Sequence, residues 1–261
     1  MAELSLLGVG KTFPLRVGGR LEAVRALDRV SFTVRDHEIV ALCGPSGCGK
    51  TTALRIAMGL ERPSEGEVTV DGVRVSGCGH DRGIVFQHAE LLPWLTALQN
   101  VMFGLEMKGV GKRQAEATAM EYLALVGLAD SARRRPHQLS GGMKQRCGIA
   151  RALAIDPGVL LMDEPFGALD SQTREQLQAE LLTIHARTRK TIVIVTHDLD
   201  EAVLLAHRIV VLSAGRVQEV IDVDLPGSRA DVAHTRALPE FARIRLRLWD
   251  ALHGAPARHA A

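Results

Sequence analysis

A short stretch, Gly44 to Thr51, has the residue types and spacing that bind phosphate groups. It reads Gly-Pro-Ser-Gly-Cys-Gly-Lys-Thr, and its glycines let the backbone turn tightly, so that successive N–H groups point at an anion. Lys50 would supply a positive charge to the outer phosphates. The Thr51 hydroxyl would ligate the magnesium ion that accompanies a nucleoside triphosphate. The stretch therefore predicts a nucleotide-binding loop.

The segments before and after this loop are predicted to be a strand and a helix, the elements that flank a phosphate-binding loop. Ile39–Cys43 is an apolar run, which predicts a short buried strand, and Thr52–Gly59 has helical character. A helix N-terminus behind the loop attracts anions, because its first N–H groups have no partner within the helix. An ordinary glycine-rich turn would lack this order of strand, loop, lysine, hydroxyl and helix, so we prefer the phosphate-binding interpretation.

Two adjacent carboxylates follow another apolar segment. Val159–Met162 predicts a fully buried strand, and Asp163 and Glu164 come directly after it. Ligands of parallel sheets bind at the carboxyl ends of the strands. One of these carboxylates can therefore serve magnesium and the other a water molecule.

Gln87 and His197 occupy the same position relative to two further strands. Gly83–Phe86 predicts a strand that ends just before Gln87, and Thr191–Val195 predicts one that ends just before His197. Either residue alone could be a structural polar group at a strand end. Because both are expected at the sheet edge that carries the phosphate loop, we treat both as candidate site residues.

A second helix N-terminus suited to anions is predicted at residues 139–142, Leu-Ser-Gly-Gly. Ser140 is placed to cap a helix beginning at Met143, and the two glycines expose backbone N–H groups. The motif lies in a region from 96 to about 154 where apolar residues recur at helical spacing. Arg133–Pro136 is expected to end the second long helix of this region.

The remaining N-terminal segments predict antiparallel strands. Residues 3–40 alternate apolar and polar positions around a glycine-rich turn at Val17–Arg20, and Asp71-Gly72 is a hairpin signal between two alternating runs. Phe13 lies in the first strand. Its ring could stack on a base or pack in the core, and the sequence leaves both roles open.

Composition excludes several classes of protein. The chain has 261 residues, 46% of them hydrophobic, which is enough for a sizeable core. With Lys+Arg 32 against Asp+Glu 30, the formal net charge of +2 favours neither nucleic acid nor an anionic membrane as partner. The apolar runs are far shorter than the roughly 18 residues that span a bilayer. The cysteines have no metal-ligand spacing, and Cys48 lies inside the phosphate loop, which favours a reducing cytoplasm.

Taken in order, these motifs resemble the nucleotide-binding subunit of an ATP-binding cassette (ABC) transporter. The likeness covers residues 3 to about 222 and includes the phosphate loop, Gln87, Leu-Ser-Gly-Gly-Met-Lys-Gln-Arg at 139–146, Asp-Glu-Pro at 163–165, Ala-Leu-Asp at 168–170 and His197. The resemblance implies an α/β P-loop NTPase fold, with a RecA-like core, an antiparallel β subdomain and an α-helical subdomain. Residues 1–95 and 155–222 would form the core with the β subdomain, 96–154 the helical subdomain with the signature motif, and 223–261 a helical C-terminal extension docked on the core.

The resemblance also implies a role for each motif position. Glu164 would be the general base, Gln87 would sense the metal and the water, and His197 would contact the γ-phosphate. Magnesium would be held at Thr51, Gln87 and Asp163. Contacts to ATP, from either chain of a dimer, would come from Phe13, Gly44, Pro45, Ser46, Gly47, Cys48, Gly49, Lys50, Thr51, Thr52, Leu139, Ser140, Gly141, Gly142, Gln145 and Asp170.

Partners follow from the same resemblance. In cassettes of this kind Ser140, Gly141 and Gly142 of one chain would close over the ATP on the phosphate loop of a second copy, so a homodimer is expected. Integral membrane permease subunits and, indirectly, an extracytoplasmic substrate-binding protein are implied, with the chain peripheral on the cytoplasmic face of the inner membrane. No nucleic-acid partner is expected.

Within the family, the segments Leu-Leu-Pro-Trp-Leu-Thr at 91–96 and Gln-Asn-Val at 99–101 resemble nitrate, sulfonate and taurine importers. The segment 163–170 with Thr173-Arg174, and residues 197–202, share this resemblance. A small anion is therefore the expected cargo. In those importers the segment after Gln87 receives a short cytoplasmic helix of the membrane subunit, so Leu91–Leu95 is a candidate contact surface, although Trp94 could simply pack. Ser213–Arg216 replaces the Pro-Gly pair common in the family, and the tail from Asp224 matches only loosely.

Three alternatives remain at this stage. An importer of another solute, such as a hydroxymethylpyrimidine-type precursor, would share all of these motifs. A soluble cassette ATPase acting on DNA or ribosomes would share the ATP site, but the chain has neither a cassette repeat nor sustained heptads. A P-loop kinase would have no use for the motif at 139–142 or for His197.

Overall fold

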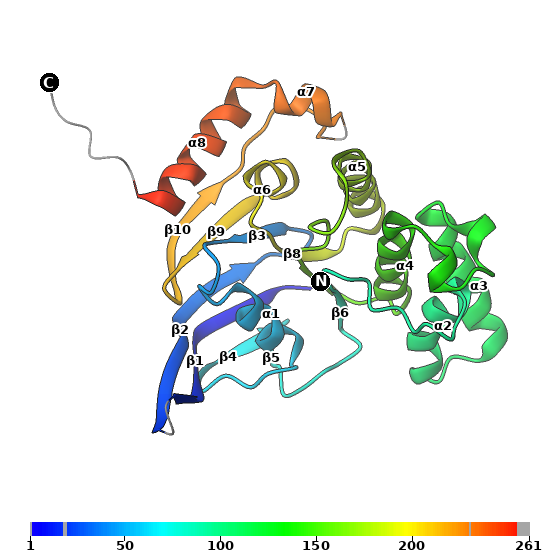
Figure 1. Cartoon of the computed structure of the whole chain (residues 1–261), viewed down its shortest axis with the longest axis horizontal. Helices are drawn as coiled ribbons and strands as arrows, with labels where there is room; N and C mark the ends of the chain where they lie inside the picture. The colour runs from blue at the N-terminus through cyan, green and yellow to red at the C-terminus, as the bar shows by residue number, and fades with distance from the viewer. Residues whose placement is uncertain (1, 18–19, 230, 255–261) are drawn as a thin grey trace, which may run out of the picture.

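The structure, a computed structural model, describes residues 2–17, 20–229 and 231–254. It is an α/β fold with two sheets, a group of helices at one side and two helices after the last strand (Figure 1). No helix within the described ranges is both long and apolar enough to cross a membrane.

The larger sheet has six strands in the order β10-β9-β3-β8-β7-β6. The strands β3, β6, β7, β8 and β9 pair in parallel, and β10 is antiparallel to β9. Every residue of β3 and β8 is buried, as expected for strands covered on both faces. The bounds are β3 Ile39–Cys43, β6 Arg82–Val85, β7 Val159–Asp163, β8 Thr191–Val195, β9 Arg208–Ser213 and β10 Arg216–Asp222.

The smaller sheet is antiparallel, in the order β2-β1-β4-β5. The hairpin predicted at Asp71-Gly72 is confirmed, and both of its turn residues have positive φ, 50° and 76°. The predicted turn at Val17–Arg20 contains Gly18 and Gly19, which lie outside the described residues. The bounds are β1 Leu4–Val17, β2 Arg20–Val34, β4 Glu65–Val70 and β5 Val73–Arg74.

The two sheets share a core that encloses α1, Lys50–Met58. Successive strand residues face opposite sides: Leu161 joins the cluster with α1 and the small sheet, whereas Leu160 joins the cluster under the other helices. Those helices include α5, Ser171–Thr188, and α6, Leu199–Leu205.

The helical group contains α2 Ala97–Met107, α3 Lys112–Leu125 and α4 Gly141–Ala154, with short 3-10 turns η1 Ala129–Ser131 and η2 Pro136–Gln138 between α3 and α4. The expectation that the second long helix ends at Arg133–Pro136 was wrong. The helix α3 ends at Leu125, and Gly127 follows with φ 69°, a left-handed conformation that stops a helix.

In the described part of the chain after β10 lie two helices, α7 Val232–Arg236 and α8 Pro239–His253. The helix α8 docks on the core through Phe241, Ile244 and Leu248, which are buried, and it contacts α6, β9 and β10. The division of the chain into core, helical subdomain and extension stays a prediction, and residues 255–261 of that extension lie outside the described part.

Candidate functional site

The phosphate loop connects β3 to α1, as the sequence predicts. Gly49 lies at the helix N-terminus with φ 103°, and a Cβ there would come within 2.5 Å of the Ala26 carbonyl oxygen. A Cβ on Gly44 would come within 2.3 Å of the Leu212 carbonyl oxygen. Side chains at these two positions would displace the loop, because the backbones of β2 and β9 approach it closely.

The loop borders a cavity of about 330 Å³. Lys50 is 8% exposed, and its Nζ donates to the carbonyl oxygens of Gly44 at 2.7 Å and Pro45 at 2.9 Å. The ammonium group therefore lies across the loop, where it can turn toward a phosphate. The cavity is lined by Ala26, Ser46, Gly47, Gly49, Lys50, Thr51, Thr52, Glu164 and His197.

Thr51, which lines this cavity, contacts Asp163 at the end of β7. The Thr51 hydroxyl donates to Asp163 Oδ1 at 3.2 Å. Burial raises the pKa of Asp163 above its ordinary value, the Thr51 hydrogen bond opposes this, and the neighbouring Glu164 charge adds to it. A hydroxyl and a carboxylate suit magnesium, which binds through one or two protein oxygens together with phosphate oxygens. The residues fit the ion, although they are too few to hold it alone.

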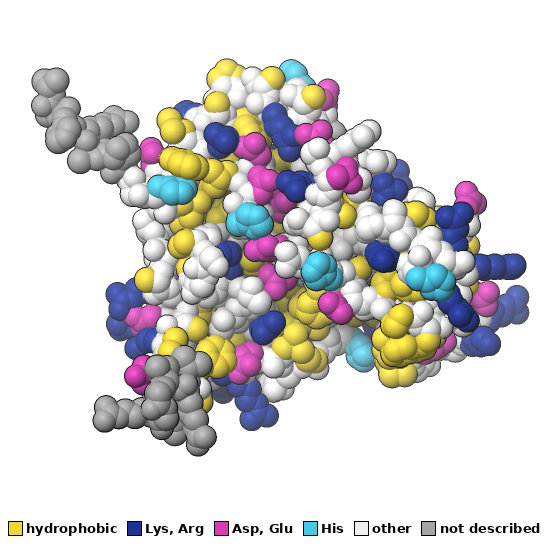
Figure 2. All heavy atoms as spheres, in the orientation of Figure 1, with side chains coloured by type: hydrophobic (Ala, Val, Ile, Leu, Met, Phe, Trp, Pro, Cys, Tyr) yellow, Lys and Arg dark blue, Asp and Glu magenta, His cyan; other side chains and the backbone are white. Residues whose placement is uncertain are grey.

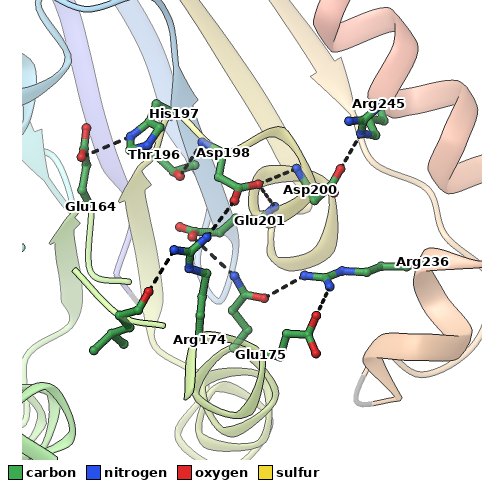
Figure 3. Close-up of polar contacts among 12 residues, drawn as sticks. Glu164, Arg174, Glu175, Thr196, His197, Asp198, Asp200, Glu201, Arg236 and Arg245 are labelled. Carbon is green, nitrogen blue, oxygen red and sulfur yellow. Dashed lines mark hydrogen bonds and ion pairs between the residues drawn. The ribbon is translucent and has the colours of Figure 1, made fainter. Parts of the chain in front are cut away.

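Gln87 and His197 both contact Glu164, and these are the three polar residues expected to act on water. Glu164 Oε2 lies 3.4 Å from Gln87 Nε2. The same oxygen lies 3.2 Å from His197 Nδ1 (Figure 3). These residues follow β6, β7 and β8, which are neighbours in the sheet, so the parallel topology brings them together. Glu164 has φ 46°, an uncommon conformation for a residue with a Cβ. Histidine and acidic side chains gather at the centre of this face, between α1 and α6 (Figure 2).

The motif at 139–142 lies apart from this cavity. Ser140 caps α4, accepting a hydrogen bond from the Met143 N–H at 3.2 Å. Leu139 and Gly142 are buried, and a Cβ on Gly142 would meet Thr173 Cγ2 at 2.5 Å, so α4 packs closely on the start of α5. None of these residues lines the cavity at the phosphate loop among the described residues.

Gln145 and Gly141 border a second hollow, of about 490 Å³, together with Gln87 and Leu91. Gln145 is buried and its Nε2 donates to the Phe86 carbonyl oxygen at 3.0 Å. The side chain predicted to contact ATP therefore holds the backbone just before Gln87 in this chain.

Asp170 and Phe13 also lie away from the cavity lining. Asp170 caps α5, and hydrogen bonds from the Thr173 backbone and side chain lower the pKa of its carboxyl. The Phe13 ring, on β1, lies 4.8 Å from Lys11 Nζ, a cation–π contact. Neither residue is among the described residues that line the cavity.

Sequence reasoning missed two residues close to the site. Ala26 lines the cavity from β2, and an alanine carries no chemical signal that could have revealed this. Arg174 joins two loops of the site, because its guanidinium donates to the Leu169 carbonyl oxygen at 3.0 Å and pairs with Asp198 at 3.5 Å. The sequence analysis used Arg174 only as part of the importer resemblance and assigned it no place at the site.

Comparisons with known proteins identify the family of this chain. The family model described as ABC transporter matches residues 27–167. The taurine import ATP-binding protein TauB of Rhizobium johnstonii is 46% identical over 235 residues, 88% of this chain and 90% of the relative. The nitrate import ATP-binding protein NrtD of Synechocystis sp. is 48% identical over 211 residues, 80% of this chain and 79% of the relative.

A solved structure is similar over the whole cassette. The ATP-binding cassette MJ0796, solved as a dimer in a post-hydrolysis state bound to ADP and Pi, superposes with a TM-score of 0.75 at 37% identity. The match covers 85% of this chain and 99% of that one. From its phosphate loop, its fold and these relatives, the chain belongs to the ABC transporter family and is an ATP-hydrolysing cassette of it.

Proposed function

We propose that this cassette drives a binding-protein-dependent importer of a small anion, a sulfonate such as taurine, or nitrate. The observation that carries the catalytic part is the meeting of Gln87, Glu164 and His197 beside the phosphate loop. The importer part is supported by relatives whose names specify taurine and nitrate import. In this proposal the chain acts peripherally on the cytoplasmic face of the inner membrane, with permease subunits and an extracytoplasmic binding protein.

The geometry supports a simple division of labour in ATP hydrolysis. The loop N–H groups and Lys50 bind and orient the phosphates, as positioning dominates phosphoryl transfer. Glu164 Oε2 accepts the proton of the attacking water, while Gln87 and His197 keep the carboxylate aimed at it. Thr51 and Asp163 would hold magnesium, which when bound neutralises charge on the phosphates.

A second copy of the chain completes this site in our proposal. Ser140 and Gly141 lie outside the cavity of their own chain, although their helix N-terminus is suited to an anion. The similar cassette MJ0796 was solved as a dimer. Closure of two chains over ATP and reopening after hydrolysis would supply the motion that transport uses.

The permease contact is proposed at the segment after Gln87. Trp94 is 67% exposed, and on the nearby helix α2 Phe103 and Met107 are 41% and 63% exposed. Figure 2 shows hydrophobic side chains grouped on the surface over α2. A large exposed aromatic suits a partner helix, and the same segment of chain, through Leu91, lines the hollow that also contains Gln87.

Trp94→Ala is expected to uncouple the transporter without stopping hydrolysis. Removing a central aromatic anchor typically costs a partner contact about 2 kcal/mol or more. Uptake into cells should therefore fall at least about tenfold, while the ATPase activity of the purified chain stays within about twofold of wild type. Val73→Ala, on the small sheet and 72% exposed, is the matched control. Equal uptake by both variants would remove Trp94 from the contact.

The cargo is tested by uptake in a strain that lacks this chain. Loss of growth on a sulfonate as sole sulfur source, or on nitrate as sole nitrogen source, with loss of labelled uptake, would support the small-anion proposal. Normal uptake of both, with loss for a pyrimidine precursor, would favour the other importer class. A purified chain that carries nucleic acid and recovers no membrane protein would favour a non-transport ATPase.

A further inference from the structure

The two loops that carry His197 and Asp170 each lead into a helix. Asp170 caps α5, and Asp198 caps α6, accepting from the N–H groups of Asp200 at 2.9 Å and Glu201 at 3.1 Å. The position of His197 at the ATP site therefore depends on how α6 lies against α5 and the sheet.

Arg174 of α5 already connects these two loops. Its Nη2 donates to the Leu169 carbonyl oxygen, next to Asp170, and its Nη1 lies 3.5 Å from Asp198 Oδ2 (Figure 3). Any charge that competes with Asp198 for this guanidinium would loosen the His197 loop.

A buried carboxyl group lies in the position to do this. Glu201 on α6 is only 3% exposed and, with Arg174, Glu164 and His197, lines a small enclosed space of about 30 Å³. Its Oε2 accepts from Gln178 Nε2 of α5 at 3.5 Å, and Gln178 is fully buried. Glu201 Oε1 receives no hydrogen bond from any residue that the structure describes. Burying an ionised carboxyl group that accepts only one long hydrogen bond costs free energy, whereas a protonated carboxyl group avoids most of this cost.

The C-terminal segment, residues 231–254, makes polar contacts with α5 and α6, one of them with Gln178. Arg236 of α7 donates from Nη2 to Gln178 Oε1 at 3.3 Å and from Nη1 to Glu175, both on α5 (Figure 3). Arg245 of α8 pairs with Asp200 of α6 at 2.5 Å. The C-terminal segment thus contacts both α5 and α6, the helices that follow the loops of Asp170 and His197.

We propose that Glu201 is a positioning residue of the ATP site: it fixes α6 and the His197 loop against α5, and Arg236 of the C-terminal segment holds it through Gln178. The role rests on the proposed function of His197 and Glu164. It gives residues 231–254 a part in setting the hydrolysis rate.

The role carries a pH dependence. Burial, with the Asp198 charge next, raises the pKa of Glu201 to about 8, against the opposing effects of Thr196, Gln178 and Arg174. Glu201 is therefore mostly neutral at pH 7 and ionises as the pH rises through about 8, when its charge competes for Arg174. The titratable and charged groups that face it are Asp198 on its own helix, Arg174 on α5, Cys43 on β3, and Glu164 and His197 across the enclosed space.

The test compares Glu201→Gln with Glu201→Ala by steady-state ATP hydrolysis with magnesium. Loss of the contact in Glu201→Ala should lower kcat about tenfold and change KM for ATP less than about twofold, because positioning of the base and histidine is lost while the phosphate loop is intact. Glu201→Gln keeps the shape as a neutral amide. It should retain kcat within about twofold at pH 7 and keep that activity at pH 9, where the wild type declines.

Arg236→Ala tests the C-terminal link, with Arg247→Ala as its matched control, because Arg247 pairs with Glu219 of β10 and makes no hydrogen bond or ion pair with α5 or α6 among the described residues. Arg236→Ala should lower kcat about threefold or more, and Arg247→Ala should not. Wild-type kcat in Glu201→Ala, an unchanged alkaline decline in Glu201→Gln, or equal rates for the two arginine variants would each overturn the proposal. Should Glu201→Ala fail to fold, the other three variants decide. Full activity in Glu164→Gln would instead overturn the proposed function itself.

Discussion

Glu164→Gln is expected to bind ATP and to hydrolyse it at least about a hundredfold more slowly than the wild type, since a general base contributes about 10²- to 10⁴-fold. The amide keeps the shape of the side chain and its contact with Gln87, but it cannot accept the proton of water. Lys50 and the phosphate loop are untouched, so ATP affinity should stay within about twofold. In gel filtration with ATP and magnesium the variant should run as a stable dimer, because closure no longer ends in hydrolysis.

Glu121→Gln, an exposed position on α3, is the matched control and should leave both the rate and the elution position unchanged. A Glu164→Gln variant that turned over at the wild-type rate and eluted as a monomer would show that another group accepts the proton. If the variant instead hydrolysed ATP slowly but eluted as a monomer, Glu164 would stand as the general base and the proposed dimer would be contradicted.

Lys50→Ala should weaken ATP binding by about ten- to a hundredfold, because a charge-assisted hydrogen bond is worth about 1.5–3 kcal/mol. The same change should remove most hydrolysis, since the outer phosphates lose the cation that neutralises their charge. Titration calorimetry with ATP and magnesium measures the affinity, and a thermal melt checks that the fold persists.

Lys108→Ala is the control for this change. Its ammonium group also donates to a backbone carbonyl oxygen, that of Ile155 at 2.7 Å, but it lies outside the cavity. Lys50→Arg adds a sharper test. Arginine keeps the positive charge, but its planar guanidinium group cannot reproduce the contact that the compact lysine ammonium group makes with a phosphate. Equal ATP affinity in Lys50→Ala and Lys108→Ala would contradict the assignment of the phosphate loop.

The amino-acid sequence by itself determined the features that depend on local backbone chemistry. The order of strand, Gly44–Thr51 and helix could be predicted, because glycines at tight turns, a buried apolar run and a helix N-terminus each have a local physical cause. The hairpin at Asp71-Gly72 followed from the same kind of reasoning. The end of α3 was missed because the rule that Pro and charge end helices was applied at Arg133–Pro136, while Gly127 had already stopped the helix.

Positions at strand ends and the family resemblance indicated the residues of the candidate site, and the tertiary structure decided how they meet. Gln87, Glu164 and His197 are far apart in the chain, and only the strand order β8-β7-β6 brings their side chains within hydrogen-bond distance. The separation of Ser140 from the phosphate loop of its own chain is likewise a property of the fold.

The residues behind the site were decided by packing alone. Arg174, Gln178, Glu201 and Arg236 belong to no motif that the sequence analysis used as a site, and they touch because α5, α6 and α7 lie against one another. Hydrophobic periodicity identifies which face of a helix is buried, but it does not say which other helix covers that face. The sequence therefore determined the phosphate loop and the identities of the reacting groups, and the contacts between distant helices determined how those groups are held.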